Sequence, residues 1–355
     1  FIDPPRSEVN DAIEECKNAG IRVIMITGDY EQTAQAIGKE IGIDAAKVLL
    51  GSEVEEMDTD GLKGRVNYIN VFSRTTPAHK LKIVEALKEN GEQVAVTGDG
   101  INDAPALKKA DIGVAMGKSG TDVARESADM VLLDDNFATI TYAVEEGRKL
   151  YDNLRKGVRY YLAVKMALIV IFLLPVIFGL QLPFAPIQII LLELFMDLAA
   201  SVTFVVEPSE TDVMKLPPRD PNAKFIDKQM NLGIIMGALS LIGAVLIVYL
   251  FALTYYPAPV ARTMAFATWM ISHVLLALNM RTIRDPLKKV GYFSNKMMII
   301  WALGAIGVMF LIVYVPGLQD LLRVTAIGAL EWLLIFGISI VFSFWMELVK
   351  IISAK

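Results

Sequence analysis

Two carboxylates and an amide gather in one short stretch, Thr97-Gly-Asp-Gly-Ile-Asn-Asp-Ala-Pro105. Asp99 and Asp103 supply the carboxylates, and Asn102 supplies the amide. Oxygen ligands of this kind suit Mg²⁺, which keeps several of its waters and takes one or two carboxylates. Because a bound Mg²⁺ neutralises the charge of a phosphoryl group, the stretch predicts a phosphoryl-transfer site. A lone Asp-Gly pair would predict only a turn that caps a helix, but the whole string favours the metal site.

The elements around this stretch predict an α/β fold. It follows the apolar run 94–96 and precedes a helical segment, 105–110. The same arrangement occurs earlier, where the run 22–26 leads into Thr27-Gly28-Asp29 and a helix over 31–41. Alternating strands and helices predict a parallel sheet with its chemistry at the carboxyl ends of the strands. Further strands are expected at 66–72, 112–116 and 130–133, and further helices at 8–19, with Ser7 as its N-cap, and at 77–89.

A lysine at the start of the predicted helix 77–89 is a further candidate. Lys80 follows Thr76-Pro-Ala-His79, and its ammonium could pair with a phosphoryl oxygen. By spacing alone a solvated surface lysine is the better interpretation, because lysine is usually exposed. We interpret His79 as a surface residue without a role.

The second half of the chain has the composition of a membrane domain. Six apolar stretches approach the roughly 20 residues that a membrane-spanning helix requires. They cover residues 158–180, 187–206, 232–253, 261–278, 297–315 and 325–349. Basic residues are concentrated in the loops 215–228 and 281–296 and in the C-terminal tail. The positive-inside rule therefore places the head, both loops and the C-terminus in the cytoplasm.

Other compositional features exclude some classes of protein. The net charge is −5, and we find no basic run long enough to predict nucleic-acid binding. The single cysteine, Cys16, excludes an internal disulfide.

Ionisable residues inside the apolar stretches are candidates for an ion pathway, because such groups are costly in a membrane. They are Lys165 in the first stretch, Glu193 and Asp197 in the second, and His273 in the fourth. Glu193 and Asp197 are four residues apart and therefore share a helix face. A purely structural ion pair is the alternative, but two carboxylates for one lysine leave one free for another cation.

The motifs, taken in order, resemble the phosphorylation domain of P-type cation ATPases, which belongs to the haloacid dehalogenase superfamily. The segments that carry the resemblance are Asp3-Pro-Pro-Arg6, Thr27-Gly-Asp29, Pro77-x-x-Lys80, Thr97 to Pro105, and Asp134-Asp-Asn-Phe137. The resemblance implies a haloacid dehalogenase-like α/β domain with a Rossmann-like parallel sheet, followed by an all-α domain of six transmembrane helices. The expected boundaries are a partial phosphorylation domain at 1–137, a stalk helix at 138–157 and the transmembrane domain at 158–355.

The resemblance also assigns roles in the soluble domain. It implies that Thr27 and Lys80 hold the phosphoryl group and that Asp99 binds Mg²⁺. Asn102 and Asp103 then complete the site, while Gly28 and Asp29 belong to the same motif as Thr27. For Lys80 this outweighs the surface interpretation. ATP is the implied substrate.

One motif of the family is missing from the chain. The nucleophilic aspartate of Asp-Lys-Thr-Gly-Thr does not occur in the 355 residues. An acyl-phosphate requires such a carboxylate, so we expect the chain to need an N-terminal part of the same pump. That part would also contribute most of the ATP-binding site. An alternative hypothesis is a membrane-anchored phosphatase-like or regulatory protein without transport.

The transported ion is a separate question. A fixed ammonium at Lys165 would repel Ca²⁺, and proton pumps of the family pair an arginine on this span with the aspartate that matches Asp197. We therefore predict a proton or another monovalent cation, with calcium as the alternative because Glu193 adds a carboxylate.

Overall fold

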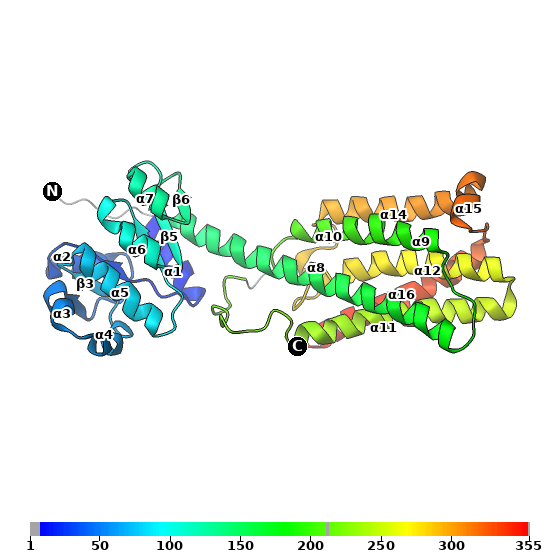
Figure 1. The fold of residues 1–355 in the computed structure, drawn as a ribbon, viewed down its shortest axis with the longest axis horizontal. Coiled ribbons are helices and arrows are strands. Elements are labelled where there is room, and N and C mark those ends of the chain that lie inside the picture. Colours follow the sequence, from blue (N-terminus) through cyan, green and yellow to red (C-terminus); the bar gives the residue numbers. More distant parts are fainter. Residues whose placement is uncertain (1–7, 211–212, 354–355) are drawn as a thin grey trace. The chain divides into compact units, whose positions relative to one another are not determined.

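The computed structural model describes residues 8–210 and 213–353, and its internal contacts divide the chain into two compact units (Figure 1). The first unit comprises the residues up to Glu146 together with Met214–Arg219. The second comprises Gly147–Val213 and Asp220–Lys355. The motif Asp3-Pro-Pro-Arg6 and the predicted N-cap Ser7 lie outside the described residues.

The first unit alternates short strands with helices, as the sequence predicts. Its strands are β1 (Met25–Ile26), β2 (Val48–Leu50), β3 (Val71–Ser73), β4 (Ala95–Gly98), β5 (Ile112–Met116) and β6 (Met130–Leu132). Its helices are α1 (Glu8–Asn18), α2 (Glu31–Glu40), α3 (Gly51–Glu56), α4 (Thr59–Val66), α5 (Pro77–Glu89), the 3₁₀ turn η1 (Ile101–Asp103), α6 (Ala104–Lys109) and α7 (Asp122–Ser127). β2, α3, α4 and α7 have no counterpart in the elements that we predicted.

The described strands form two parallel sheets of three, with the orders β1-β3-β2 and β4-β5-β6. Met25 and Val48 both pair with Val71, and in the second sheet Val114 pairs with Met130. The parallel α/β class is therefore confirmed, but the strands form two separate sheets where we expected one. Strands β1 and β4, which lead into the two Thr-Gly-Asp turns, are each the edge strand of their sheet within the described chain.

Helices cover both faces of the first sheet. Successive side chains of a strand point to opposite faces, and in β3 both faces carry apolar side chains that need cover. Phe72 packs with side chains of α3, α4 and α5, whereas Val71 packs with those of α1 and α2. Helix α5 also reaches the second sheet: Ile83 lies in the first core and Val84 in a core with Val96 of β4. Helix α5, which carries the candidate Lys80 in its first turn, is therefore fixed to both sheets.

The second unit is built from helices, of which the long ones are apolar. They are the greater part of α8 (Ala138–Ile177), then α9 (Pro186–Leu191), the π-helical η2 (Leu192–Asp197), α10 (Leu198–Val205), α11 (Lys228–Tyr255), α12 (Ala258–Asn279), α13 (Leu287–Val290), α14 (Lys296–Tyr314), α15 (Pro316–Leu322) and α16 (Ala329–Ser353). In the described chain six helical segments are long and apolar enough to cross a membrane, with α9, η2 and α10 together forming one of them. The number of predicted spans is therefore confirmed. The predicted stalk and first span form one continuous helix, α8.

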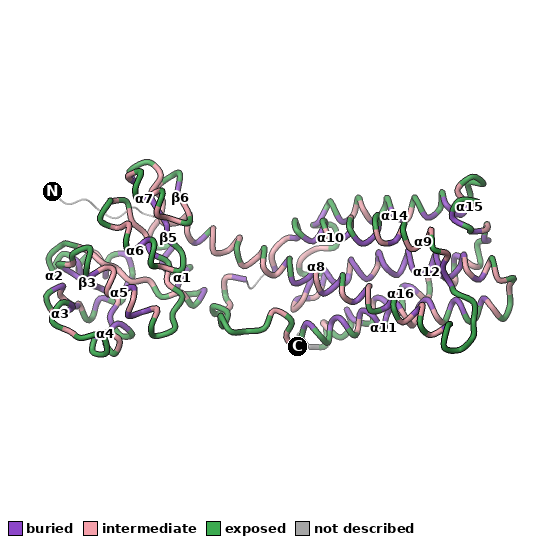
Figure 2. Tube along the Cα trace, viewed as in Figure 1, coloured by how far each residue is buried: buried purple, intermediate pink, exposed green. Residues whose placement is uncertain are grey.

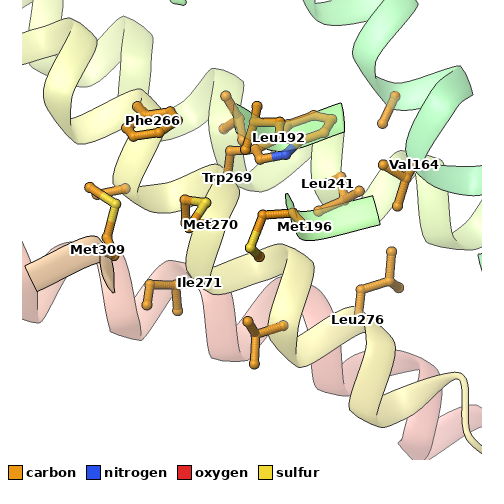
Figure 3. Packing of buried hydrophobic residues seen from close by; sticks show 14 of the residues in the cluster. Val164, Leu192, Met196, Leu241, Phe266, Trp269, Met270, Ile271, Leu276 and Met309 are labelled. Atoms are coloured by element: carbon orange, nitrogen blue, oxygen red, sulfur yellow. The ribbon is translucent and has the colours of Figure 1, made fainter. Parts of the chain in front are cut away.

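Helix α12 is the centre of this unit and packs against α11, α14 and α16. Figure 3 shows Trp269 and Met270 of α12 beside Leu192 and Met196 of the neighbouring span. α12 is buried along most of its length, whereas α14 exposes one face (Figure 2). An all-apolar helix that exposes a face in this way suits contact with lipid.

Candidate functional site

The turn after β4 is shaped by its second aspartate. One oxygen of Asp103, Oδ2, accepts the backbone N–H groups of Asp99 (3.2 Å) and Gly100 (3.1 Å). A Cβ at Gly98 would lie 2.5 Å from the Cβ of Asp103, so this position requires glycine. The Asp103 carboxylate therefore lies on the concave side of the turn, where it binds the backbone amides and packs against Gly98.

Lys80 is anchored at the same turn. Its ammonium donates to Oδ1 of Asp103 (2.7 Å) and to the carbonyl oxygen of Thr97 (2.8 Å). A capping box positions the first turn of α5: the Thr76 N–H donates to Nδ1 of His79, and the His79 N–H donates to the Thr76 hydroxyl. The expectation of a surface His79 was therefore wrong, because the imidazole is buried and serves as a cap.

The segment 74–80 joins the two Thr-Gly-Asp turns. Thr75 donates both its N–H (3.1 Å) and its hydroxyl (2.9 Å) to the carbonyl oxygen of Thr27, and the Arg74 N–H donates to that of Asp29 (3.0 Å). Lys80, at the other end of the segment, donates to Thr97. Arg74 has φ 53°, a left-handed conformation that is uncommon outside glycine and often occurs at functional sites. Arg74 and Thr75 are not among the predicted site residues, although their position just after a strand was a usable signal.

The first Thr-Gly-Asp turn is ordered by its own side chains. The Thr27 hydroxyl donates to Oδ2 of Asp29 (2.9 Å) and accepts the Asp29 N–H (3.1 Å). Gly28 between them is exposed. A threonine hydroxyl and a glycine amide beside a strand end are groups that can contact a phosphoryl oxygen.

Two polar side chains of the second turn remain available for a ligand. Asp99 and Asn102 are exposed, and neither side chain has a hydrogen-bond partner among the described residues. Asp103 could reach a metal only with an oxygen that already accepts a hydrogen bond. In the described chain, no three acidic, histidine or cysteine side chains are grouped as a metal site. One free carboxylate and a neighbouring amide nevertheless fit Mg²⁺, which needs few protein ligands.

The ion pair between Lys80 and Asp103 makes a pH-dependent contribution to stability. Burial by itself would raise the pKa of Asp103, but the Lys80 ammonium and the amides of Gly100 and Asp99 outweigh it, so the pKa lies below 3.8. This contribution is complete above the unfolded pKa of 3.8 and is lost as the pH falls through the lower folded value.

Lys80→Met should therefore lower the free energy of unfolding at pH 7 by roughly 1.5–3 kcal/mol, the worth of a hydrogen bond to a charged group. The difference between the variant and the unmodified chain should shrink as the pH falls below 3.8. Thermal unfolding in detergent between pH 7 and pH 3 measures both effects. Lys108→Met, at an exposed lysine of α6, is the control. A difference that stays constant with pH would contradict the ion pair.

In the second unit, Lys165 contacts both acidic residues of the next span. Its ammonium pairs with Oε2 of Glu193 and with Oδ2 of Asp197, the latter at 2.5 Å. Asp197 is buried, whereas the side chain of Glu193 is 40% exposed. The structure thus brings together three of the four residues that were singled out, and the formal charges of these three leave one negative charge in excess.

His273 lies on the other side of Asp197. Its Nε2 is 3.4 Å from Oδ1 of Asp197, and the imidazole is fully buried between the rings of Tyr160 and Trp269. Among the described residues, Oδ1 of Asp197 and both ring nitrogens of His273 have no hydrogen-bond partner. Buried polar atoms without partners are rare in native proteins, so this place suits a bound cation or water.

The backbone of the acidic span is irregular at the same place. Residues from Leu192 to Asp197 form a π-helix between the α-helical segments α9 and α10. Such π-bulges occur frequently at functional sites. Glu193 and Asp197 do meet the same partner, as their spacing predicts, but on a wider turn than an α-helix would give.

The chain matches two known families. Residues 1–111 match the haloacid dehalogenase-like hydrolases, and residues 181–352 match the family described as "Cation transporting ATPase, C-terminus". The chain is 40% identical over 350 residues to a calcium-transporting ATPase of Bacillus subtilis, covering 97% of the chain and 39% of that relative.

Two other relatives give the same result. Calcium-transporting ATPase type 2C member 2 of Rattus norvegicus is 37% identical over 99% of the chain, and a calcium-transporting ATPase of Listeria monocytogenes is 38% identical over 100% of it. The chain covers 38% and 40% of these two relatives. The order of the two matched families also agrees with the α/β unit and the six apolar helices described above. The chain therefore belongs to the P-type cation-transporting ATPases, is a multi-pass membrane protein, and corresponds to the C-terminal part of the relatives that it matches.

Proposed function

We propose that this chain forms the C-terminal part of an ATP-driven cation pump that passes through an aspartyl-phosphate. The observation that carries this proposal is the link between the two Thr-Gly-Asp turns. Segment 74–80 is bonded to Thr27 at one end and to Thr97 at the other, next to the exposed Asp99. A structural loop would not require an ammonium, a free carboxylate and two strand-end turns at one place.

In this proposal each residue of the turns has one task. The Thr27 hydroxyl and the Gly28 amide bind phosphoryl oxygens, and Asp29 orients that hydroxyl. Lys80 pairs with a third oxygen, and Asp103 holds the lysine and the curve of the turn. Asp99, assisted by Asn102, would hold Mg²⁺. The metal would supply charge neutralisation at the phosphoryl group.

The carboxylate nucleophile must come from outside the 355 residues, because the family's nucleophile motif is absent from them. The chain spans about two fifths of the length of the relatives that it matches. The edge strands β1 and β4 each have one side without a strand partner in the described chain. We propose that the N-terminal portion of the pump adds a strand there that carries the aspartate, and that it also binds ATP.

We propose Ca²⁺ as the cargo, on the basis of the relatives, which are named calcium-transporting ATPases. The prediction of a proton or another monovalent cation is not supported by these names, and the calcium alternative fits them better. Asp197, Glu193 and the unpartnered atoms at His273 would line the binding site. Calcium binding requires Lys165 to leave at least one carboxylate, since Ca²⁺ takes six to eight oxygen ligands.

The domain boundaries and the orientation belong to the same proposal. Residues 1–137 form the partial phosphorylation domain, residues 138–157 form the stalk, and residues 158–355 carry the six spans. The basic loops and the C-terminus lie in the cytoplasm together with the head, as the positive-inside rule requires. The continuous helix α8 connects the stalk with Lys165 and would carry motion to the ion site.

The test compares two proteins in detergent: the 355-residue chain alone, and the full-length pump, meaning this chain joined to its N-terminal portion. The chain alone should neither hydrolyse ATP nor form an acid-stable phosphoenzyme, because it lacks the nucleophile. The full-length pump should do both, with activation by Ca²⁺. A covalent phosphate on the chain alone would overturn the proposal that the nucleophile is supplied from outside it.

A further inference from the structure

A buried carboxylate in the segment that follows α10 binds the backbone of a distant connection. Glu210 is 3% exposed and accepts the N–H groups of Ile283, Arg284 and Asp285, all at 2.9 Å. These residues belong to the connection between α12 and α14. Burial would raise the pKa of Glu210, but the charge of Lys156 and the three amides outweigh it, so the pKa lies below its ordinary value. The group is therefore a carboxylate at neutral pH.

A second carboxylate, three residues earlier in the same segment, holds the other part of this connection. Glu207 is fully buried; it pairs with the fully buried guanidinium of Arg281 at 2.9 Å and accepts the Asn295 amide at 2.6 Å. Arg281 in turn donates to the carbonyl oxygens of Gly291 (3.2 Å) and Tyr292 (2.7 Å). Charged groups buried this deeply are retained only with their partners in place.

Helix α8 is joined to both of these contacts. Lys156, which is fully buried, lies 3.4 Å from Oε1 of Glu210. Arg159, one helical turn further, donates to the carbonyl oxygens of Met280 (3.2 Å) and Thr282 (2.9 Å). The charged collar, as we call it, consists of Lys156 and Arg159 of α8, Glu207 and Glu210 beyond α10, and Arg281 beyond α12.

The three helices that meet in the charged collar are also those that carry the candidate ion site. Lys165 lies nine residues after Lys156 on α8, Asp197 precedes Glu207 by ten residues, and His273 precedes Arg281 by eight. At ~1.5 Å per helical residue, the separation on α8 is about 13 Å along the helix. A shift of α8 against the other two helices at the ion site would therefore be constrained by the collar.

We propose that the charged collar is a rigid pivot that fixes α8, α10 and α12 to one another and thereby sets the geometry of the cation site, with Glu210 and Lys156 as positioning residues. This inference deepens the proposed function and rests on it for the identity of the ion. A merely structural role would hold the connection 280–295 in place without affecting the ion site.

The control for that distinction contacts the same connection from another helix. Glu347 of α16 is also buried and accepts the Leu287 N–H at 2.5 Å, but α16 carries none of the ion-site side chains. In the full-length pump, Glu210→Gln should raise the Ca²⁺ concentration for half-maximal ATPase activation about tenfold, within the range of coupling between sites. It should also lower the Ca²⁺ moved per ATP. Glu347→Gln should leave both quantities within about twofold, whatever its effect on the melting temperature.

Lys156→Gln is the second variant, in case Glu210→Gln does not fold. It keeps the three amide bonds of Glu210 and removes the ion pair between Glu210 and α8, so it should shift the activation curve in the same direction. Equal shifts for Glu347→Gln, or no shift for a folded Glu210→Gln or Lys156→Gln pump, would overturn the proposal.

Hydrogen exchange tests the pivot independently of the cargo. The amides of Ile283, Arg284 and Asp285 should remain protected both without nucleotide and with Mg²⁺ plus vanadate, a phosphate analogue, because a rigid pivot does not open. Loss of protection in either state of the wild-type pump would contradict the pivot. If instead Ca²⁺ fails to activate the wild-type pump while these amides stay protected, the proposed cargo is wrong and the pivot stands.

Discussion

Asp99→Asn in the full-length pump should reduce Mg²⁺-dependent phosphoenzyme formation from ATP by at least about a hundredfold, the scale seen when one preorganised charge-stabilising group is removed. Asp99 is the exposed carboxylate of the turn whose side chain has no partner among the described residues. Its replacement should therefore cost little stability. The loss should fall on the chemistry, because the amide cannot hold Mg²⁺ with a full charge.

The measurement is acid-stable incorporation of phosphate from labelled ATP at several Mg²⁺ concentrations. Asp60→Asn, at an exposed carboxylate of α4, should behave as the wild type. Asp103→Asn should reduce phosphoenzyme as well, but with a lower melting temperature, because Asp103 holds Lys80 and two turn amides. Near-normal phosphoenzyme in the Asp99 variant would refute the assignment of the metal site.

Each Thr-Gly-Asp turn of the candidate soluble site could be predicted because the residues of one turn are local in the sequence. Each Thr-Gly-Asp turn directly follows a short apolar run, and the carboxyl ends of parallel strands are where such turns gather. The link through Thr75 could not be predicted, since it joins Thr27 to a residue 48 positions away. Strand β2 was missed because its three residues, Val48–Leu50, are too few to give a period.

Hydropathy located the spans, but the sequence did not show which charged residues near the ends of the spans are buried. Arg281 was counted as a loop charge for the positive-inside rule, and it is fully buried in an ion pair with Glu207. Composition cannot distinguish a solvated arginine from one that pairs with a carboxylate on another connection. The usable signal was the pair Glu207 and Glu210, two acids three residues apart directly after an apolar span. The π-helix from Leu192 to Asp197 leaves no comparable mark in the sequence.

In the candidate membrane site, the Lys165 ammonium lies where we propose that Ca²⁺ binds. Lys165 pairs with both Glu193 and Asp197, so a divalent cation must displace an ammonium before it can bind both carboxylates. Lys165→Ala in the full-length pump should therefore lower the Ca²⁺ concentration for half-maximal ATPase activation, by about tenfold if the displacement costs ~1.4 kcal/mol. Asp197→Asn should raise it by about a hundredfold or more, because a buried ligand charge is lost.

The measurement uses proteoliposomes with chelator-buffered Ca²⁺, in which ATPase activity, ⁴⁵Ca uptake and lumenal pH are followed together. Lys228→Ala, at an exposed lysine at the start of α11, is the control and should match the wild type.

A proton pump would behave in the opposite way, since the ammonium would then keep one carboxylate charged while the other carries the proton. In that case the wild type would be independent of Ca²⁺, would build a pH gradient that collapses in Asp197→Asn, and would lose transport in Lys165→Ala. Lys165 thus separates the two cargoes, because removing one positive charge helps a divalent ion and harms a proton carrier.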